Sequence, residues 1–139
     1  MRAPGFMQLA RIDELRFIMA CRHGLVHVTW GRITLRFSRQ EFRRLGGLVE
    51  RATDALSPDS VHDGALRVTA RPDEDCEVRV GPLALLLPPA EFQAFVKAVR
   101  EAVQRLDEIL ASGIWDQDEA EEARPSVIDQ LRRTRFSHN

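Results

Sequence analysis

Tyrosine is absent from this sequence of 139 residues, lysine occurs once, as Lys97, and cysteine occurs twice. Cys21 and Cys76 are too few for a disulfide framework, and their spacing matches no zinc motif. No apolar run approaches the roughly 18 residues that a membrane-spanning helix needs. The first residues also lack the apolar stretch of a secretory signal. We therefore expect a cytoplasmic protein with two free thiols, no cofactor and no membrane contact.

Net charge and catalytic motifs are also nearly absent. The formal charge is −1, although 29% of the residues are charged, so no bulk field favours nucleic acid or an acidic membrane. The sequence has no phosphate-binding loop, nucleophile elbow, HExxH or CxxC motif. Gly46 and Gly47 adjoin inside an expected helix, where they favour close helix packing instead of phosphate binding. The sequence therefore favours a non-catalytic protein.

What the sequence does contain is an internal repeat. Residues 26–56 align with residues 76–106 without a gap, at an offset of 50 residues. The identical pairs include Val28 with Val78, Gly31 with Gly81, Leu35 with Leu85, Glu41 with Glu91, and Phe42 with Phe92. Such positions have structural roles in strands, turns and helices, so we interpret the pattern as an internal duplication.

Each copy predicts strands followed by a helix. Apolar residues alternate with polar ones over 26–30 and again over 33–37, which is the period of half-buried strands, and Gly31 interrupts them as a hairpin turn would. A further strand precedes each hairpin, around Ile18 and around Val68. Apolar residues then recur at helical spacing from Phe42 and from Phe92. The predicted unit is βββα, and it occurs twice.

The predicted fold class is therefore α+β, with antiparallel sheet or sheets, one long helix per repeat packed on one sheet face, and a short carboxy-terminal helix. Whether the six strands form one sheet or two is left open by the sequence. The expected segments are an amino-terminal segment (1–15), the first repeat (16–57), a linker (58–65), the second repeat (66–113), an acidic linker (114–125) and a docking or disordered tail (126–139). In the amino-terminal segment, Phe6, Leu9, Ile12 and Leu15 have the spacing of a short amphipathic helix.

Glu41 and Glu91 occupy equivalent places near the start of each expected helix. Ser38 and Glu41 form a capping-box pattern, in which each side chain bonds a backbone N–H of the other residue. A carboxylate in the first turn also favours the positive end of the helix. We therefore interpret both glutamates as helix caps instead of as a catalytic pair.

The predicted outer sheet face is where the two copies differ most. The first copy places Phe17, Met19 and Cys21 there, and the second copy places Ala84 and Leu86 on its last strand. An apolar surface patch usually marks a contact site. Its cover is either a segment of the same chain or a second protein, and the tail offers three apolar residues of its own, Val127, Ile128 and Leu131. The leading hypothesis is a small adaptor or accessory subunit that self-associates, as a homodimer, through this face.

Two alternatives remain. An arginine-rich sheet face can bind nucleic acid, and the candidate residues are Arg32, Arg36, Arg67, Arg71 and Arg79. Single-strand binding also needs exposed aromatic residues, and Phe17 is the only clear one in the sequence.

The second alternative is a metal- or haem-binding module at Cys21, His23 and His27, because thiol and imidazole groups are the usual ligands of zinc and haem iron. A buried cysteine is more often a small apolar filler, and the spacing nominates no fourth ligand.

Overall fold

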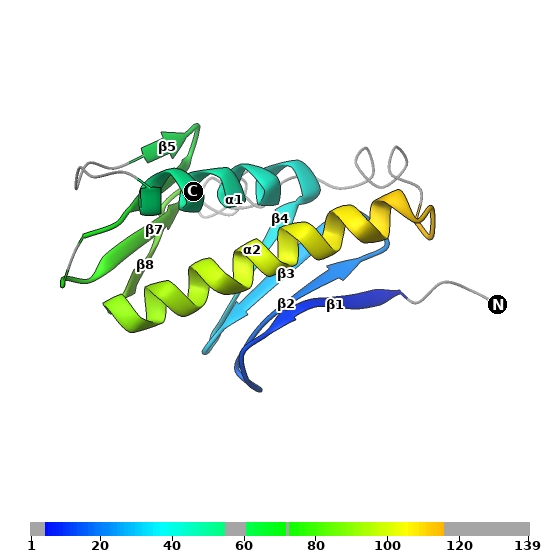
Figure 1. Cartoon of the computed structure of the whole chain (residues 1–139), viewed down its shortest axis with the longest axis horizontal. Coiled ribbons are helices and arrows are strands. Elements are labelled where there is room, and N and C mark those ends of the chain that lie inside the picture. The colour runs from blue at the N-terminus through cyan, green and yellow to red at the C-terminus, as the bar shows by residue number, and fades with distance from the viewer. Residues whose placement is uncertain (1–4, 55–60, 72, 116–139) are drawn as a thin grey trace, which may run out of the picture.

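The computed structural model describes residues 5–54, 61–71 and 73–115, which form an α+β fold of two antiparallel sheets and two helices (Figure 1). In chain order the elements are β1 (Phe6–Arg11), β2 (Arg16–Cys21), β3 (Leu25–Trp30), β4 (Ile33–Ser38), α1 (Arg39–Asp54), β5 (Val61–Asp63), β6 (Leu66–Thr69), β7 (Cys76–Val80), β8 (Leu83–Leu87) and α2 (Pro89–Ala111). Each half of the chain thus supplies one sheet followed by one helix.

Both sheets are meanders in which every strand pairs with its neighbour in sequence. The first sheet has the order β1-β2-β3-β4 and the second has the order β5-β6-β7-β8. Their central registers agree at an offset of 50 residues: Val28 pairs with Ile18 and Leu35, and Val78 pairs with Val68 and Leu85. The first strand of each sheet does not follow this offset, and a bulge interrupts the pairing of β1 with β2.

The last hairpin of each sheet turns at a glycine, Gly31 in the first sheet and Gly81 in the second. Gly31 and Gly81 have φ angles of 68° and 58°, a region that side chains rarely adopt. A glycine at the first position of a two-residue turn matches the twist of the flanking strands. The amide of Gly31 donates to the carbonyl of Leu15 at 2.8 Å, and that of Gly81 donates to the carbonyl of Ala65 at 2.9 Å. The predicted hairpin glycines are confirmed.

Each helix packs on both halves of the chain. α1 lies on β3 and β4 and continues onto β5 and β6, whereas α2 lies on β8 and on β1 and β2 (Figure 1). Ion pairs join Arg43 to Asp107 at 2.8 Å and Glu50 to Arg100, so the partners run in opposite sequence order and the helices are antiparallel. The halves therefore share one core.

Close contacts between the halves fill that core. The Trp30 and Phe95 rings meet edge to face, with centroids 5.1 Å apart. A Cβ atom added to Gly46 would lie 2.8 Å from Cγ2 of Val103, so this glycine lets α1 approach α2 closely. The expectation of close helix packing at the glycine pair is confirmed for Gly46. At Gly47 an added Cβ would meet nothing within 4 Å.

Three expectations require correction. The amino-terminal segment is not a helix: Phe6–Arg11 is strand β1, because pairing with β2 places Leu9 and Ala10 in the core. The expected linker 58–65 contains strand β5. Each half thus has four strands where the sequence predicted three, and they form two sheets. The predicted carboxy-terminal helix and tail (126–139) and most of the acidic linker lie outside the described residues.

Within the described ranges, neither helix combines the length and the apolar character that crossing a membrane requires.

Candidate functional site

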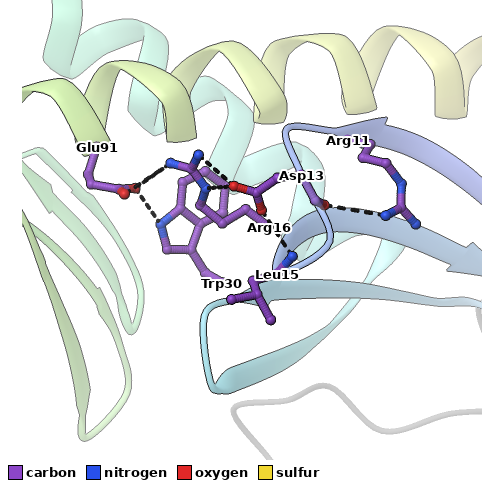
Figure 2. Close-up of polar contacts among 6 residues, drawn as sticks. All are labelled: Arg11, Asp13, Leu15, Arg16, Trp30 and Glu91. Carbon is purple, nitrogen blue, oxygen red and sulfur yellow. Dashed lines mark hydrogen bonds and ion pairs between the residues drawn. The ribbon is translucent and has the colours of Figure 1, made fainter.

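A cluster of polar side chains joins the first sheet to the start of α2 (Figure 2). Arg16, the first residue of β2, donates to both carboxylate oxygens of Glu91, at 2.9 and 3.0 Å, and pairs with Asp13 at 2.7 Å. The indole N–H of Trp30 donates to the same Glu91 carboxylate at 3.2 Å. The Arg16 hydrogen bond holds the pKa of Asp13 below its usual value, and the two carboxylates raise the pKa of Arg16. Every carboxylate here is matched by a donor, so the cluster fastens the two halves together.

Glu41 and Glu91, which occupy equivalent places at the starts of α1 and α2, make different contacts. Glu41 accepts from the amide of Ser38 at 3.1 Å, and its own amide donates to Oγ of Ser38 at 3.1 Å, so the predicted capping box is confirmed. Glu91 also lies in the first turn of its helix, as expected, but it does not repeat the capping box, because the cap residue Pro88 has no backbone N–H to donate. Its carboxylate turns to Arg16 and Trp30 of the other half, and Pro88, at the cap of α2, makes no side-chain bond there.

The outer face of the first sheet, which points away from the helices, is the first candidate binding surface. We define it by six residues of β1–β4 that alternate with the buried ones: Phe6, Arg11, Phe17, Met19, His27 and Arg36. Cross-strand pairs place Arg11 beside Phe17, Phe17 beside Thr29, Met19 beside His27, and His27 beside Arg36. The six side chains therefore form one connected surface.

Aromatic and cationic groups contact one another on this face. The Phe6 side chain is 60% exposed, and its ring centroid lies 5.8 Å from that of His27. The Arg11 guanidinium lies over the Phe17 ring, 4.9 Å from its centroid. Burial, and secondly the charge of Arg36, lower the pKa of His27, so this imidazole is neutral at pH 7.

The charge on this face has one sign. None of the four strands β1–β4 contains aspartate or glutamate, whereas Arg11 and Arg36 are exposed on the outer face. Arg32 adds a further exposed guanidinium in the turn between β3 and β4. The protein as a whole has a formal charge of −1, so positive charge is concentrated here.

The outer face of the second sheet is different in composition. We define it by Arg67 of β6, Glu77 and Arg79 of β7, and Ala84 and Leu86 of β8. Glu77 and Arg79 form an ion pair at 3.1 Å, so both signs are present. Leu86 pairs across the strands with Glu77, and its side chain is 64% exposed. This face combines an apolar edge strand with charges of both signs.

The predicted interface residues are thus divided between two sheets. Phe17 and Met19 lie half-buried on the first sheet, and Ala84 and Leu86 are exposed on the second. Cys21 is buried at the end of β2, so it does not contribute to an exposed patch. Val127, Ile128 and Leu131 lie outside the described residues.

The predicted arginine band is divided in the same way. Arg32 and Arg36 belong to the first sheet, and Arg67 and Arg79 belong to the second, where Arg79 is neutralised by Glu77. Arg71 is exposed just beyond the end of β6. No strand of one sheet pairs with a strand of the other among the described residues, so the five arginines do not line one continuous sheet.

The three residues of the predicted metal or haem site do not come together as one set of metal ligands. Across residues 5–54, 61–71 and 73–115, no group of three or more histidine, cysteine, aspartate or glutamate side chains is placed to hold a metal ion. Cys21 is buried at the strand end, His23 is exposed in the turn, and His27 contacts the Phe6 ring from the middle of β3. The spacing of these three residues in sequence therefore did not predict a common site.

The sequence analysis did not single out three residues that the structure makes prominent: Phe6 and Arg11 on the first outer face, and Arg39 in the core. Phe6 was placed in a segment with helical spacing and Arg11 was not singled out, although the alternation of Phe6 and Gln8 with Met7 and Leu9 is also the period of a strand. Arg39 was not singled out, yet it is fully buried, donates to the carbonyl of Arg22 at 3.4 Å and lies 5.6 Å from the Trp115 ring. It joins the start of α1 to the end of β2 and to the residues after α2.

Comparisons of the chain with protein-family models, with curated proteins and with solved structures found no match. The function therefore has to be argued from the two outer faces.

Proposed function

We propose that this protein is a non-catalytic protein-interaction module that self-associates as a homodimer through the outer face of the second sheet. The observation that carries the proposal is Leu86, a leucine of edge strand β8 whose side chain is 64% exposed on the outer face of the second sheet. Ala84 lies two residues away on the same strand, so the apolar surface extends along β8. Exposed apolar residues in a contiguous group are typical of protein contacts.

The charges on this face support a second copy of the chain as the partner. In a twofold dimer the same patch is used by both subunits, so the patch must complement itself. Glu77 and Arg79 supply one charge of each sign beside the apolar strand, and Arg67 is the cross-strand neighbour of Arg79. A twofold axis near Leu86 can therefore bring Glu77 of each subunit toward an arginine of the other.

The first sheet is less suited to the same role. Its outer face presents Arg11 and Arg36 and no carboxylate from any of its strands. Two such faces packed together would oppose arginine with arginine, and like charges in an interface are costly. We therefore restrict the proposed self-association to the second sheet.

We also infer that the chain arose by internal duplication. Support comes from the shared offset of 50 residues in the central registers and in the hydrogen bonds of Gly31 and Gly81. Glu50 and Arg100, which are equivalent positions at that offset, pair with each other between the helices. Such a contact arises when two copies of one unit meet about a twofold axis, so the halves resemble a fused dimer of ββββα units.

Light scattering coupled to size-exclusion chromatography tests the self-association directly. Leu86→Glu would place a carboxylate at the centre of the interface, and we expect the dissociation constant to rise roughly tenfold or more. Leu15→Glu is the matched control, because Leu15 is 65% exposed but lies in the turn between β1 and β2. Its mass profile should stay that of the unaltered protein.

A monomeric unaltered protein at all concentrations would overturn the proposal. So would a dimer that Leu15→Glu and Leu86→Glu weaken equally, because the interface would then lie elsewhere. Circular dichroism of each variant checks that the strands are retained, which separates loss of the interface from loss of the fold.

A further inference from the structure

We propose that the outer face of the first sheet binds single-stranded nucleic acid, with Phe6 and Phe17 stacking on bases and Arg11 and Arg36 contacting phosphates. This binding is separate from the proposed self-association, because it uses other residues on the other sheet. Three observations carry the inference: the exposed Phe6 ring beside the half-buried Phe17 ring, the single sign of the charge and the order in which these side chains lie across the strands.

The aromatic rings provide the stacking surfaces. Proteins that bind single strands without sequence preference stack bases on aromatic side chains beside a positively charged path. Strand β1 brings Phe6 onto the same face as Phe17, and the Phe6 side chain is 60% exposed. His27 contacts the Phe6 ring at 5.8 Å and widens the aromatic surface at that end. The structure thus adds the exposed ring of Phe6, which the sequence alone did not reveal, to the half-buried ring of Phe17 on the same face.

The positions of the rings suit two bases of one strand that are not adjacent. Phe6 pairs with Cys21, and Phe17 lies four residues earlier on β2, which places the two rings roughly 13 Å apart along the strand direction. The thioether side chain of Met19 lies between them on the same face and offers a further apolar contact. A single strand that follows β2 would therefore meet Phe17, Met19 and Phe6 in turn.

The arginines lie where phosphates would pass. Arg11 is on β1 beside Phe17, and Arg36 is on β4, beyond His27. The guanidinium of Arg11 already lies over the Phe17 ring at 4.9 Å, so it can stack with a base as well as bind a phosphate. Thr29 and Thr34 hydrogen bond to each other at 3.0 Å between these arginines and present hydroxyl groups to the strand. No strand of this sheet carries a carboxylate that would repel the phosphates.

An acidic protein segment is the main rival occupant, since it would match the same arginines. The aromatic rings favour nucleic acid, because a base has a flat face that stacks on phenylalanine, whereas an aspartate or glutamate side chain has none. A test therefore has to vary the rings and the arginines separately.

The direct experiment is fluorescence anisotropy of the full chain with a labelled oligo(U) and with a labelled oligo(dT). Each oligonucleotide has a length within the roughly 4 to 16 nucleotides that such sites cover. We expect both single strands to bind, and a duplex of the same length to bind more weakly. Phe6→Ala should weaken binding about tenfold, which is within the usual contribution of one stacked base. Because Phe6 is exposed, this substitution leaves the core intact.

A salt series separates the arginines from the rings. Each phosphate contact that is lost should reduce the slope of log K against log salt by about 0.7 for a single strand. Arg11→Gln combined with Arg36→Gln should thus reduce the slope by about 1.4, whereas Phe6→Ala should leave it unchanged. The matched control is Arg44→Gln combined with Arg51→Gln, two exposed arginines of α1 outside both outer faces, which removes the same number of arginines and should change neither affinity nor slope.

Three results would overturn the proposal. The first is no anisotropy change with either single strand up to about 100 μM protein. The second is equal weakening by the arginine pair of the first sheet and the arginine pair of α1, which would indicate diffuse attraction instead of a site. The third is binding of labelled polyglutamate as tight as that of the oligonucleotides and insensitive to Phe6→Ala, which would assign the face to an acidic protein. None of these results depends on whether Leu86 mediates self-association.

Discussion

The outer faces of the two sheets share one backbone plan and carry different chemistry. At equivalent register positions the first sheet has Phe17 paired with Thr29, and the second has Arg67 paired with Arg79. The first face is aromatic and carries charge of one sign, whereas the second has an exposed leucine on its edge strand and an internal ion pair. The difference shows that strand pairing restricts the inward residues and leaves the outward ones free to acquire separate functions.

The inner sides of the same sheets are more alike, but they also differ at one position. Trp30 and Val80 end equivalent strands and are both buried. Trp30 meets the Phe95 ring edge to face and donates to Glu91, so it connects the first sheet to α2 of the other half. We therefore expect Trp30 to contribute more to the free energy of unfolding than Val80, its equivalent in the second sheet.

Trp30→Ala should produce the largest effect. Truncating a buried aromatic residue usually lowers the free energy of unfolding by about 3 to 5 kcal/mol, and here the Glu91 carboxylate also loses a donor. Val80→Ala, at the equivalent position, removes less apolar surface and should cost about 2 kcal/mol. Urea denaturation of both variants gives the comparison. Equal losses would mean that the contacts of Trp30 with α2 add nothing to stability.

Glu77→Gln should have an intermediate effect, which we expect on the dissociation constant of the proposed homodimer. The substitution leaves the second outer face with positive charge only, like the first. The variant removes the only carboxylate among the residues that define this face, so the proposed homodimer would oppose arginines without a partner. Loss of a partly exposed ion pair contributes up to about 1 kcal/mol, so we expect the dissociation constant to rise up to roughly fivefold. Sedimentation equilibrium measures this constant. Glu14→Gln, an exposed carboxylate in the turn after β1, serves as the control and should change nothing.

The smallest expected effect is the contribution of His27 to the pH dependence of folding stability. It tests the burial and charge around this imidazole on the first outer face. Its pKa in the folded chain lies below the ordinary value of 6.5, because burial and the Arg36 charge disfavour the imidazolium. The unfolded chain therefore binds this proton at a higher pH than the folded chain does. The associated stability is present above about pH 6.5 and is lost as the pH falls through the folded pKa.

Urea denaturation at about pH 7.5 and at about pH 5.5 checks this sign, with His27→Gln as the reference that lacks the group. The unaltered protein should lose more stability than His27→Gln on acidification. Arg36→Gln should reduce the difference, since the second cause of the shift is removed while Phe6 and Met19 still cover the ring. A larger loss in His27→Gln than in the unaltered protein would contradict the assignment.

Local patterns in the sequence predicted several parts of the fold. The Ser38–Glu41 capping box and the hairpin glycines depend on contacts within a few residues, so they are readable from sequence spacing. The failures involve β1 and β5. Phe6–Arg11 is so short that its apolar residues fit the period of a helix as well as that of a strand. Pairing with β2 makes this segment a strand. Val61–Asp63 is only three residues long, too short for periodicity to identify.

The candidate sites were predictable only in part for a related reason. Alternation along β2 and β8 correctly separates Phe17 from Ile18 and Leu86 from Leu85, but it does not tell which strands share a sheet. The predicted apolar patch and the predicted arginine band were therefore each divided between two sheets. Phe6 joined the first face only because β1 adds to that sheet.

The two outer faces thus separate what the sequence determines from what the tertiary structure decides. Alternation and helical spacing determine which side chains point outward and where each turn and helix begins, because these depend on neighbours along the chain. Which outward side chains meet is decided by the pairing of whole strands and by the crossing of each helix onto the other half. These contacts join residues distant in sequence, and their free energy comes from burying the shared core, which no local pattern encodes.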